Sequence, residues 1–505
     1  MKKISLLSIM MIAWLLTTNF LESSQISQSA TAISYVNVNS AGSTISNPGI
    51  YYLTGNVSFY PTTDPTISTI IHVTTSNVTI NLNANTISQA STNSTLDLNA
   101  IVIDPDVHHV TIQNGTISGV SGVGVVIGEG CTDITIKNMQ MTNCVQGGLT
   151  ATGTSSSLIF SLTLQNLLLS KNNGDPSAYG DSTNTYSPLG MKIVNAAHFD
   201  ISSCECIANQ TETNDTAYGL YLQQCSNGII SNSAFSGNQS NEAVYGVLME
   251  QCVALEINNS KFVRNVSLAY NAYGCALIGS DDNKIYKSQS LSNSGNALTY
   301  GFFLQGFEDS TPTYYGSNDN SIIECSSSAN ATVLGNCYGY FSSGNAANNF
   351  IQSRAQGNRS GTTSGSIAAG FYAEQLTEYT TTYNETLTNV NKCVSKANYS
   401  QDSNGIGAGI LINTVLRGNI EGNWVLSNTG VLSSYGIVDL TAESSSLIMS
   451  NYAFGHTTNY LATYEDPNDA IPVISGTVGD FTTLANVTPF VNYEWRNNCG
   501  CYTTT

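Results

Sequence analysis

Charge is what this sequence lacks most. Asp, Glu, Lys and Arg make up 10% of its 505 residues, against roughly 25% in ordinary globular domains. Cations are the rarer sign, because 15 Lys and Arg face 34 Asp and Glu, which gives a formal net charge of −19. Such a surface repels phosphate groups, so we expect neither nucleic acid nor anionic lipid as a partner.

Long apolar runs are absent too, except for one near the N-terminus. It covers residues 4–16, follows two lysines and is too short to span a membrane comfortably. An Ala-Thr-Ala cleavage pattern at residues 30–32 comes after it, so residues 1–32 are predicted to be a secretory signal peptide. We expect a mature chain that starts near Ile33, has no membrane span, and is secreted, periplasmic or displayed on the cell surface.

Familiar catalytic motifs are missing as well, since no Gly-x-Ser-x-Gly, zinc or nucleotide pattern occurs. The stretch Asp104-Pro105-Asp106 with His108 and His109 looks metal-like. It stands between two apolar segments, however, where a bend is expected and such residues are ordinary. The sequence therefore predicts no metal ion and no cofactor.

What is present is a repeat between about residues 190 and 453. A glycine followed by apolar residues, often with Tyr before it, recurs at Gly219, Gly246, Gly274, Gly301, Gly339, Gly370, Gly409 and Gly436. Between these copies an apolar residue stands eight positions before an Asn. The apolar column reads Ile201, Ile230, Ile257, Ile285, Ile322, Phe350, Val390 and Ile420. The Asn column reads Asn209, Asn238, Asn265, Asn293, Asn330, Asn358, Asn398 and Asn428, with neighbours 27 to 40 residues apart, a period typical of repeat folds.

The repeat has a direct physical interpretation. Apolar residues alternate with polar ones inside each copy, which indicates strands. One pair of short strands buries too little apolar surface to fold alone, but stacked copies cover each other's core. We therefore expect an all-β chain, a right-handed parallel β-helix of about 13 rungs with a C-terminal capping segment. The Asn column should stack as an amide ladder, whereas the alternative fold, a β-sandwich, does not predict fixed columns.

Cysteines follow the same columns. Cys204, Cys325 and Cys393 stand five positions before an Asn, where most other copies have Ser, so they are expected to be buried as small apolar residues. Cys225 and Cys252 each stand six positions after a repeat glycine and should lie on adjacent rungs. A disulfide between them would need unusual backbone geometry.

The N-terminal segments contain sequence patterns similar to those of the repeat. Residues 49–53 read Gly-Ile-Tyr-Tyr-Leu, residues 78–83 read Val-Thr-Ile-Asn-Leu-Asn, and residues 110–117 read Val-Thr-Ile-Gln-Asn-Gly-Thr-Ile. In these phrases the chain resembles the right-handed parallel β-helix proteins of the pectate-lyase-like superfamily, over roughly residues 47–455. The resemblance implies the fold but no single activity, because the group holds lyases, hydrolases, epimerases, phage depolymerases and adhesins. The expected domains are a signal peptide (1–32), the β-helix (33–455) and a C-terminal cap or tail (456–505).

The resemblance also implies catalytic equipment that the sequence can be checked for. A polygalacturonase-like hydrolase would show an Asp pair, a further Asp and a Gly-His-Gly on neighbouring rungs. Here the pair Asp281-Asp282 precedes a bend, and His456 stands many rungs away. A pectate-lyase-like site would need carboxylates for calcium and an Arg as base, and no Arg of the repeat stands in a matching motif. No catalytic residue is assigned.

One column of the repeat indicates a partner surface. If the residues one and three positions after each repeat glycine point inward, the residue two positions after it points outward. This outward column reads Tyr221, Leu248, Ala276, Phe303, Phe341, Tyr372, Leu411 and Val438. An exposed apolar stripe of this kind is typical of a partner surface or a ligand groove, and three consecutive aromatic residues in it would form a platform.

Two insertions, residues 305–318 and 375–388, leave the rung at the same corner beside that platform. Aromatic and acidic side chains in paired loops suit sugars, whose rings stack while their hydroxyls form hydrogen bonds. The loops could instead fold over the apolar column and hide it. The expected ligand-binding residues are Phe303, Phe341, Tyr372, Glu308, Asp309, Tyr314, Tyr315, Glu374, Glu378, Tyr379, Tyr383 and Glu385.

Three hypotheses remain open. The first is an exported rod that binds a polysaccharide or a cell-surface glycan, or another cell-surface partner, without identifiable catalysis. The second is a polysaccharide lyase or glycoside hydrolase with Glu308, Asp309, Glu374 and Glu378 as candidate acids. The third is a structural surface protein whose apolar stripe forms a homotrimer.

Overall fold

The computed structural model describes most of the chain between residues 30 and 495. The described ranges are 30–33, 42–59, 68–90, 97–173, 187–210, 215–308, 314–344, 347–374, 388–413, 418–440, 447–462, 473–476 and 492–495. Most of the predicted signal peptide lies outside them and stays a prediction. Its cleavage motif coincides with a short strand at Ala30–Ile33, so cleavage before Ile33 would remove most of that strand.

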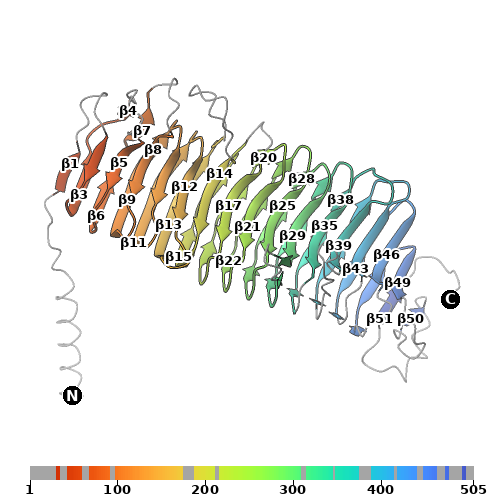
Figure 1. Cartoon of the computed structure of the whole chain (residues 1–505). Coiled ribbons are helices and arrows are strands. Elements are labelled where there is room, and N and C mark those ends of the chain that lie inside the picture. The colour runs from red at the N-terminus through yellow and green to blue at the C-terminus, as the bar shows by residue number, and fades with distance from the viewer. Residues whose placement is uncertain are drawn as a thin grey trace, which may run out of the picture.

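The described chain winds into a rod, with the first strands at one end and the last at the other (Figure 1). Almost all strand pairs are parallel, and each strand pairs with its equivalent one turn later, so the fold is the expected right-handed parallel β-helix. Sheet B contributes one strand to each turn. Its strands are β2 (Ser43–Ile45), β5 (Thr69–Val73), β8 (Asn99–Ile103), β10 (Val123–Ile127), β12 (Gly147–Thr152), β14 (Leu189–Val194), β17 (Ala217–Gln223), β21 (Val244–Glu250), β25 (Ala272–Ile278), β29 (Thr299–Gln305), β35 (Cys337–Ser343), β39 (Ile367–Glu374), β43 (Ile406–Asn413), β46 (Ser433–Asp439) and β49 (Thr458–Ala462).

Sheet A forms the adjoining walls, mostly with two short strands in each turn. Its strands are β1 (Ala30–Ile33), β3 (Gly49–Leu53), β4 (Val57–Phe59), β6 (Val78–Asn81), β7 (Thr86–Gln89), β9 (His108–Ser118), β11 (Thr132–Thr142), β13 (Ile159–Ser170), β15 (Ala196–Ser202), β16 (Glu205–Ile207), β18 (Ile229–Ser231), β19 (Ala234–Ser236), β22 (Glu256–Asn258), β23 (Lys261–Val263), β26 (Lys284–Tyr286), β27 (Gln289–Leu291), β32 (Ser321–Ile323), β33 (Ser326–Ser328), β36 (Asn349–Ile351), β37 (Arg354–Gln356), β40 (Thr388–Asn391), β41 (Val394–Lys396), β44 (Gly418–Glu421), β45 (Trp424–Leu426), β47 (Leu447–Met449), β48 (Tyr452–Phe454), β50 (Val473–Gly476) and β51 (Asn492–Trp495). The strand ladder thus continues past Gly455, the boundary expected from the sequence.

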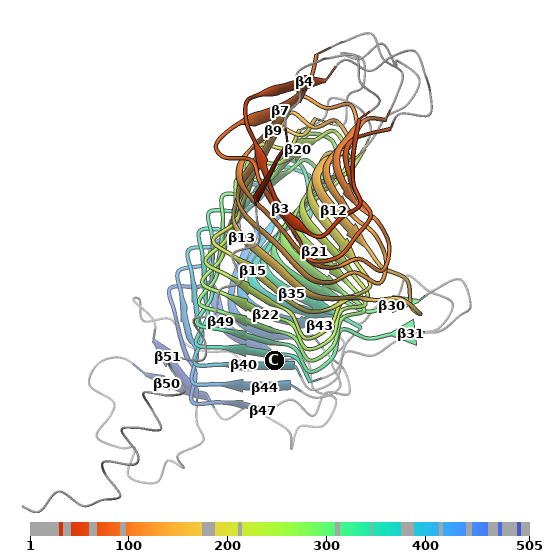
Figure 2. The same ribbon diagram turned by 90° about the vertical axis from the view of Figure 1, so that its left-hand side faces the viewer.

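Two smaller sheets complete the turns. Sheet C lies at the corner that leads into sheet B and consists of β20 (Gln239–Ser240), β24 (Val266–Ser267), β28 (Ser294–Gly295), β34 (Ala331–Thr332), β38 (Arg359–Ser360) and β42 (Tyr399–Ser400). An antiparallel hairpin, β30 (Phe307–Glu308) and β31 (Tyr314–Tyr315), projects from the side of the rod (Figure 2).

The interior confirms the predicted columns. Ile230 pairs in register with Ile257, and Ile257 with Ile285, and all three side chains are buried. The buried Asn column forms the expected amide ladder, because each Nδ2 from Asn209 onward donates to the Oδ1 of the next Asn at 2.8–3.0 Å, up to Asn428. At most of these rungs the backbone N–H donates to the same oxygen. Each interior amide is therefore satisfied by its neighbour.

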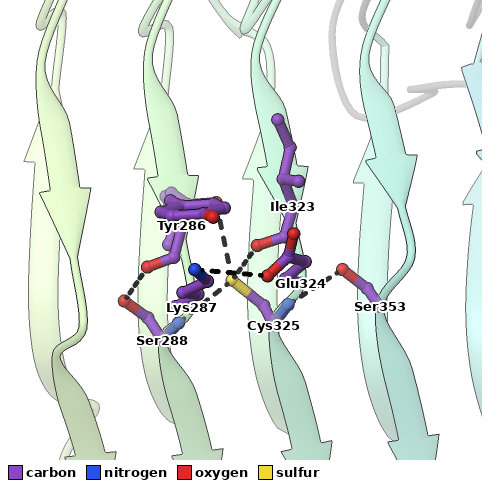
Figure 3. Close-up of polar contacts among 8 residues, drawn as sticks. Tyr286, Lys287, Ser288, Ile323, Glu324, Cys325 and Ser353 are labelled. Carbon is purple, nitrogen blue, oxygen red and sulfur yellow. Dashed lines mark hydrogen bonds and ion pairs between the residues drawn. The ribbon is translucent and has the colours of Figure 1, made fainter.

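A second ladder joins the rungs through the Ser and Cys column (Figure 3). The Ser288 N–H donates to Cys325 Sγ at 3.4 Å, and the Cys325 N–H donates to Ser353 Oγ at 3.2 Å. The ten described cysteines are all buried and free, and Cys225 and Cys252, on adjacent rungs, form no disulfide. Burial raises the pKa of Cys325 to about 12, so this thiol stays protonated and inert at neutral pH.

Candidate ligand-binding groove

The repeat glycines on sheet B are required by close approach of the backbones. A Cβ atom at Gly301 would collide with the carbonyl oxygen of Gly339 on the next strand and with the Ser327 side chain. The same clash with the next glycine's carbonyl recurs from strand to strand along this column. Glycine is the residue that leaves room for such contacts.

The glycine also reverses the alternation of side chains along the strand. Phe302 and Leu304 belong to the main core, as predicted, and Phe303 between them points outward. Tyr300 points outward as well, although simple alternation would place it with Phe302. The position of Gly301, which faces the interior, accounts for this shift. Each turn therefore presents two outward side chains.

These two columns form a second apolar cluster on the outside of sheet B. Stacked tyrosines make one column, with ring centroids 4.5 Å apart between Tyr245 and Tyr273 and 5.0 Å apart between Tyr273 and Tyr300. Phe303 and Phe341 stack in the other at 5.1 Å, tilted by 64° and 72° from the Tyr300 ring. Aromatic contacts of this kind stabilise the face beyond the area that they bury.

The apolar stripe points outward as expected, but the expectation that it is exposed is wrong. Phe303, Phe341 and Tyr372 point outward, but they are only 4%, 5% and 7% exposed. Their neighbours on adjacent rungs and the tyrosine column cover them laterally. The outward face is therefore the floor of a depression instead of an open surface.

A cavity of about 490 Å³ lies over this floor and crosses four strands, β25, β29, β35 and β39. We call it the aromatic groove. Its lining residues are Asn271, Tyr273, Leu298, Tyr300, Phe303, Gln305, Asn336, Tyr338, Phe341, Ser343, Ile367, Tyr372 and Glu374. An aromatic floor with a few polar groups at its margins is typical of a small-molecule or glycan site.

Amide and hydroxyl groups form one margin of the groove. Asn271 Nδ2 donates to the Tyr273 hydroxyl at 3.1 Å, and Asn336 Nδ2 donates to the Tyr338 hydroxyl at 2.8 Å. The Asn336 side chain is held in turn, because its Oδ1 accepts the Ile367 N–H at 2.8 Å. These hydrogen bonds fix the phenol groups, so the margin is preorganised for a ligand.

The opposite margin carries a carboxylate. Tyr372 Oη donates to Glu374 Oε2 at 2.6 Å. Burial, and then the nearby carboxylate, raise the pKa of Tyr372 well above its usual value. Burial also raises the pKa of Tyr338. Both phenols are therefore neutral hydrogen-bond donors at physiological pH.

The structure brings together four of the expected ligand-binding residues, because Phe303, Phe341, Tyr372 and Glu374 all line the groove. The others are not placed there. Tyr314 and Tyr315 belong to the β30–β31 hairpin, where they lie against Gly306 and Gly279. The Glu308 backbone is in β30, while its side chain and Asp309, Glu378, Tyr379, Tyr383 and Glu385 lie outside the described residues.

Sequence reasoning missed the tyrosine column and its amide partners. Tyr273, Tyr300 and Tyr338 each directly precede a repeat glycine, so their recurrence was visible in the sequence. Strict alternation would place that position in the interior, so it does not reveal that these tyrosines face outward. Asn271 and Asn336 each stand two positions before one of these tyrosines, which is a weaker signal of the same kind.

The metal-like stretch separates into individual contacts. His72 contacts Asp104, His108 Nδ1 lies 2.9 Å from Thr132 Oγ1, and His109 Nε2 lies 3.3 Å from Asp133 Oδ2. Within the described ranges, no three His, Cys, Asp or Glu residues gather closely enough to hold a metal ion. That part of the chain also has no helix long and apolar enough to cross a membrane.

No protein-family model matches the sequence, and no curated protein matches it significantly. Several solved structures are similar in fold. The mannuronan C-5 epimerase AlgE6 A-module of Azotobacter vinelandii is 10% identical, with 83% of this chain and 91% of that chain covered and a TM-score of 0.42. The periplasmic alginate epimerase AlgG is 10% identical, with 81% and 84% covered and a TM-score of 0.43. A double mutant of the tailspike protein of E. coli bacteriophage HK620 is 11% identical, with 83% and 72% covered and a TM-score of 0.40. Likeness at this level says nothing about what this chain binds.

Proposed function

We propose that this chain is an exported β-helix protein that binds glycan in the aromatic groove without turning it over. The observation that supports this most strongly is the groove itself, with stacked aromatic rings below and fixed hydroxyl, amide and carboxylate groups beside them. Sugars offer apolar ring faces and many hydroxyls, which match this combination. Export rests on the N-terminal signal peptide pattern.

The carboxylates favour binding over catalysis. Among the described residues that line the groove, Glu374 supplies the one carboxylate. Glycoside hydrolysis ordinarily needs two carboxyl groups within roughly 5–10 Å of each other. A lyase or hydrolase would therefore have to draw its further acids from Glu308, Asp309 or Glu378. A homotrimer built on the stripe has less support, because the outward column is already buried within one chain.

The test is binding to a glycan array with a matched pair of double variants. Phe303→Ala with Phe341→Ala removes two side chains of the floor, and we expect about tenfold or greater loss of affinity, since the apolar surface under a bound sugar is lost. Val102→Ala with Val126→Ala is the control, because these residues stand at the same outward position of β8 and β10, away from the groove. Equal loss in both double variants, or in neither, would overturn the groove as the binding site.

Turnover is measured on the same glycans by reducing-sugar and unsaturated-product assays. Release of products that is lost in Glu374→Gln would replace the binding proposal with the enzyme. Sedimentation of the purified chain checks the third hypothesis, and a trimer that dissociates in the Phe303→Ala, Phe341→Ala variant would favour a structural role.

A further inference from the structure

The aromatic groove carries no cationic side chain. Of its thirteen lining residues, none is Lys, Arg or His, and Glu374 is the ionisable residue besides the tyrosines. Burial keeps the Tyr338 and Tyr372 phenols neutral. Recognition of a carboxylate or sulfate normally uses Arg or Lys, which pair with it directly. The lining of this groove has no cation to pair with such a group.

The segments that follow the four groove strands in the sequence carry further negative charge. After β25, β29, β35 and β39 the sequence runs through residues 279–283, 306–320, 344–348 and 375–387 before it re-enters sheet A. These segments hold no Lys, Arg or His, and their carboxylates are those of Asp281, Asp282, Glu308, Asp309, Asp319, Glu378 and Glu385. The sequence that follows the groove strands is therefore anionic in composition.

Cations elsewhere on the rod do not line the groove. On the outer face of sheet B, Lys192 stands on β14, three strands before β25, which is roughly 14 Å at the spacing between strands. That distance exceeds the Debye length of about 8 Å at physiological ionic strength. Its ammonium group lies over the Tyr221 ring, 5.6 Å from the centroid. At the corner that leads into sheet B, Arg264 and Arg359 do not line the groove.

We propose that the aromatic groove selects a neutral, hydroxyl-rich glycan and discriminates against polyuronate and sulfated chains. This rests on the proposed glycan binding. A sugar hydroxyl can donate to the Glu374 carboxylate and accept from the phenol and amide margin. A sugar carboxylate in the same place would lose its water, meet another carboxylate and find no counter-ion. The charge of the groove and of the whole chain, −19, acts in the same direction.

The experiment compares one glycan in two charge states. A neutral oligosaccharide that binds the full-length chain is oxidised at its primary hydroxyls to the corresponding polyuronate, so ring shape and linkage are kept. Affinities for both are measured by calorimetry at low and at high salt. We expect the neutral form to bind at least about tenfold more tightly at low salt, with a smaller gap at high salt because screening weakens repulsion.

A charge variant makes the comparison sharper. Gln305→Lys introduces a cation into the groove, whereas Gln223→Lys makes the same change at the equivalent position of β17, which does not line the groove. Gain of polyuronate affinity in the first variant and none in the second would support the proposal. Absence of any gain in Gln305→Lys would overturn the electrostatic explanation.

The two proposals fail in different ways. If the polyuronate binds the unmodified chain as tightly as the neutral form, and this binding is lost in the Phe303→Ala, Phe341→Ala variant, the selectivity is wrong while the glycan function stands. If a folded chain binds no glycan of either charge, the proposed function is wrong and the selectivity falls with it.

Discussion

The two halves of sheet B differ at one and the same outward position. Read in register, the first six strands present Thr44, His72, Val102, Val126, Thr150 and Lys192, which are exposed or half-buried. The next eight present Tyr221, Leu248, Ala276, Phe303, Phe341, Tyr372, Leu411 and Val438, and all but Tyr221 are buried. The backbone pairing is the same throughout, so the β-helix does not require the aromatic column.

The amide ladders of the two halves differ in a parallel way. In the N-terminal half, partly exposed amides form an outer ladder, with Asn138 donating to Asn114 at 3.1 Å and Asn166 donating to Asn138 at 2.9 Å. In the C-terminal half the ladder from Asn209 to Asn428 is fully buried. Interior hydrogen bonds thus hold the rungs behind the aromatic groove, and they involve none of its lining residues.

The largest effect is expected at the glycine that separates the two outward columns. Gly301→Ala places a methyl group against the Gly339 carbonyl and the Ser327 side chain, so we expect a loss of about 3–5 kcal/mol in the free energy of unfolding. Gly55→Ala, in the N-terminal half, is the control, because its added Cβ meets no atom within 4 Å. Chemical denaturation measures both, and a Gly301→Ala variant as stable as Gly55→Ala would contradict the close-approach explanation.

The next effect separates the buried ladder from the exposed one. Asn293→Ala removes from the interior the oxygen that accepts both the Asn265 backbone N–H and one N–H of its side-chain amide, which should cost about 2–4 kcal/mol. Asn138→Gly removes a link of the exposed ladder, where water replaces the amide and glycine tolerates the left-handed backbone (φ 53°), and should cost less than about 1 kcal/mol. Similar losses in the two variants would show that the interior position of the ladder has no special role.

The fold could be predicted because repeats magnify weak signals. No single Ile or Asn identifies a β-helix, but Ile230, Ile257 and Ile285 at near-constant spacing confine the chain to one winding. The amide ladder followed from the same spacing. The prediction that the cysteines of the Cys204 column are buried was also confirmed, because burial at that position depends on the size of the side chain.

The groove could be predicted only in part. Phe303, Phe341 and Tyr372 follow from strand alternation, whereas Tyr300 does not, because Gly301 reverses the alternation through a backbone contact with a strand 38 residues later in the sequence. Burial of the outward column was also out of reach, since it depends on how rings on neighbouring rungs pack. The positions of Tyr314 and Tyr315 depend on the hairpin, which the alternating pattern does not specify.

A smaller loss of stability is expected when an aromatic residue of the groove is replaced by the residue found at the same outward position in the N-terminal half of sheet B. Phe303→Thr, which installs the residue that β12 carries at Thr150, should cost about 2 kcal/mol, because the stacking with Phe341 and the contacts with Tyr300 are lost. The reverse change, Thr150→Phe, lies on a half-exposed position and should stay within about 0.5 kcal/mol of the parent. Thermal unfolding compares the two. A Thr150→Phe change as damaging as Phe303→Thr would mean that both halves are packed alike.

The last effect concerns the end of the buried ladder, is absent at neutral pH and develops only as the pH falls. Asn428 N–H donates to His456 Nε2 at 3.1 Å, so a neutral imidazole takes the place of the next Asn. Burial lowers the pKa of His456 from 6.5 to about 4. Between these values the unfolded chain binds more protons than the folded one, so the contribution of His456 to stability is complete above about pH 6.5 and is lost as the pH drops through 4, by roughly 3 kcal/mol in all.

The variant that isolates this contribution is His456→Asn, which restores the residue that the column uses elsewhere. Carboxylates also titrate in this range, so the quantity to measure is the difference in unfolding free energy between the parent and the variant at several pH values. That difference should shift in favour of the variant as the pH falls below about 6.5 and level off near 4. A difference that does not change with pH would mean that His456 is not held neutral by the end of the ladder, and the buried column would then close at Asn428.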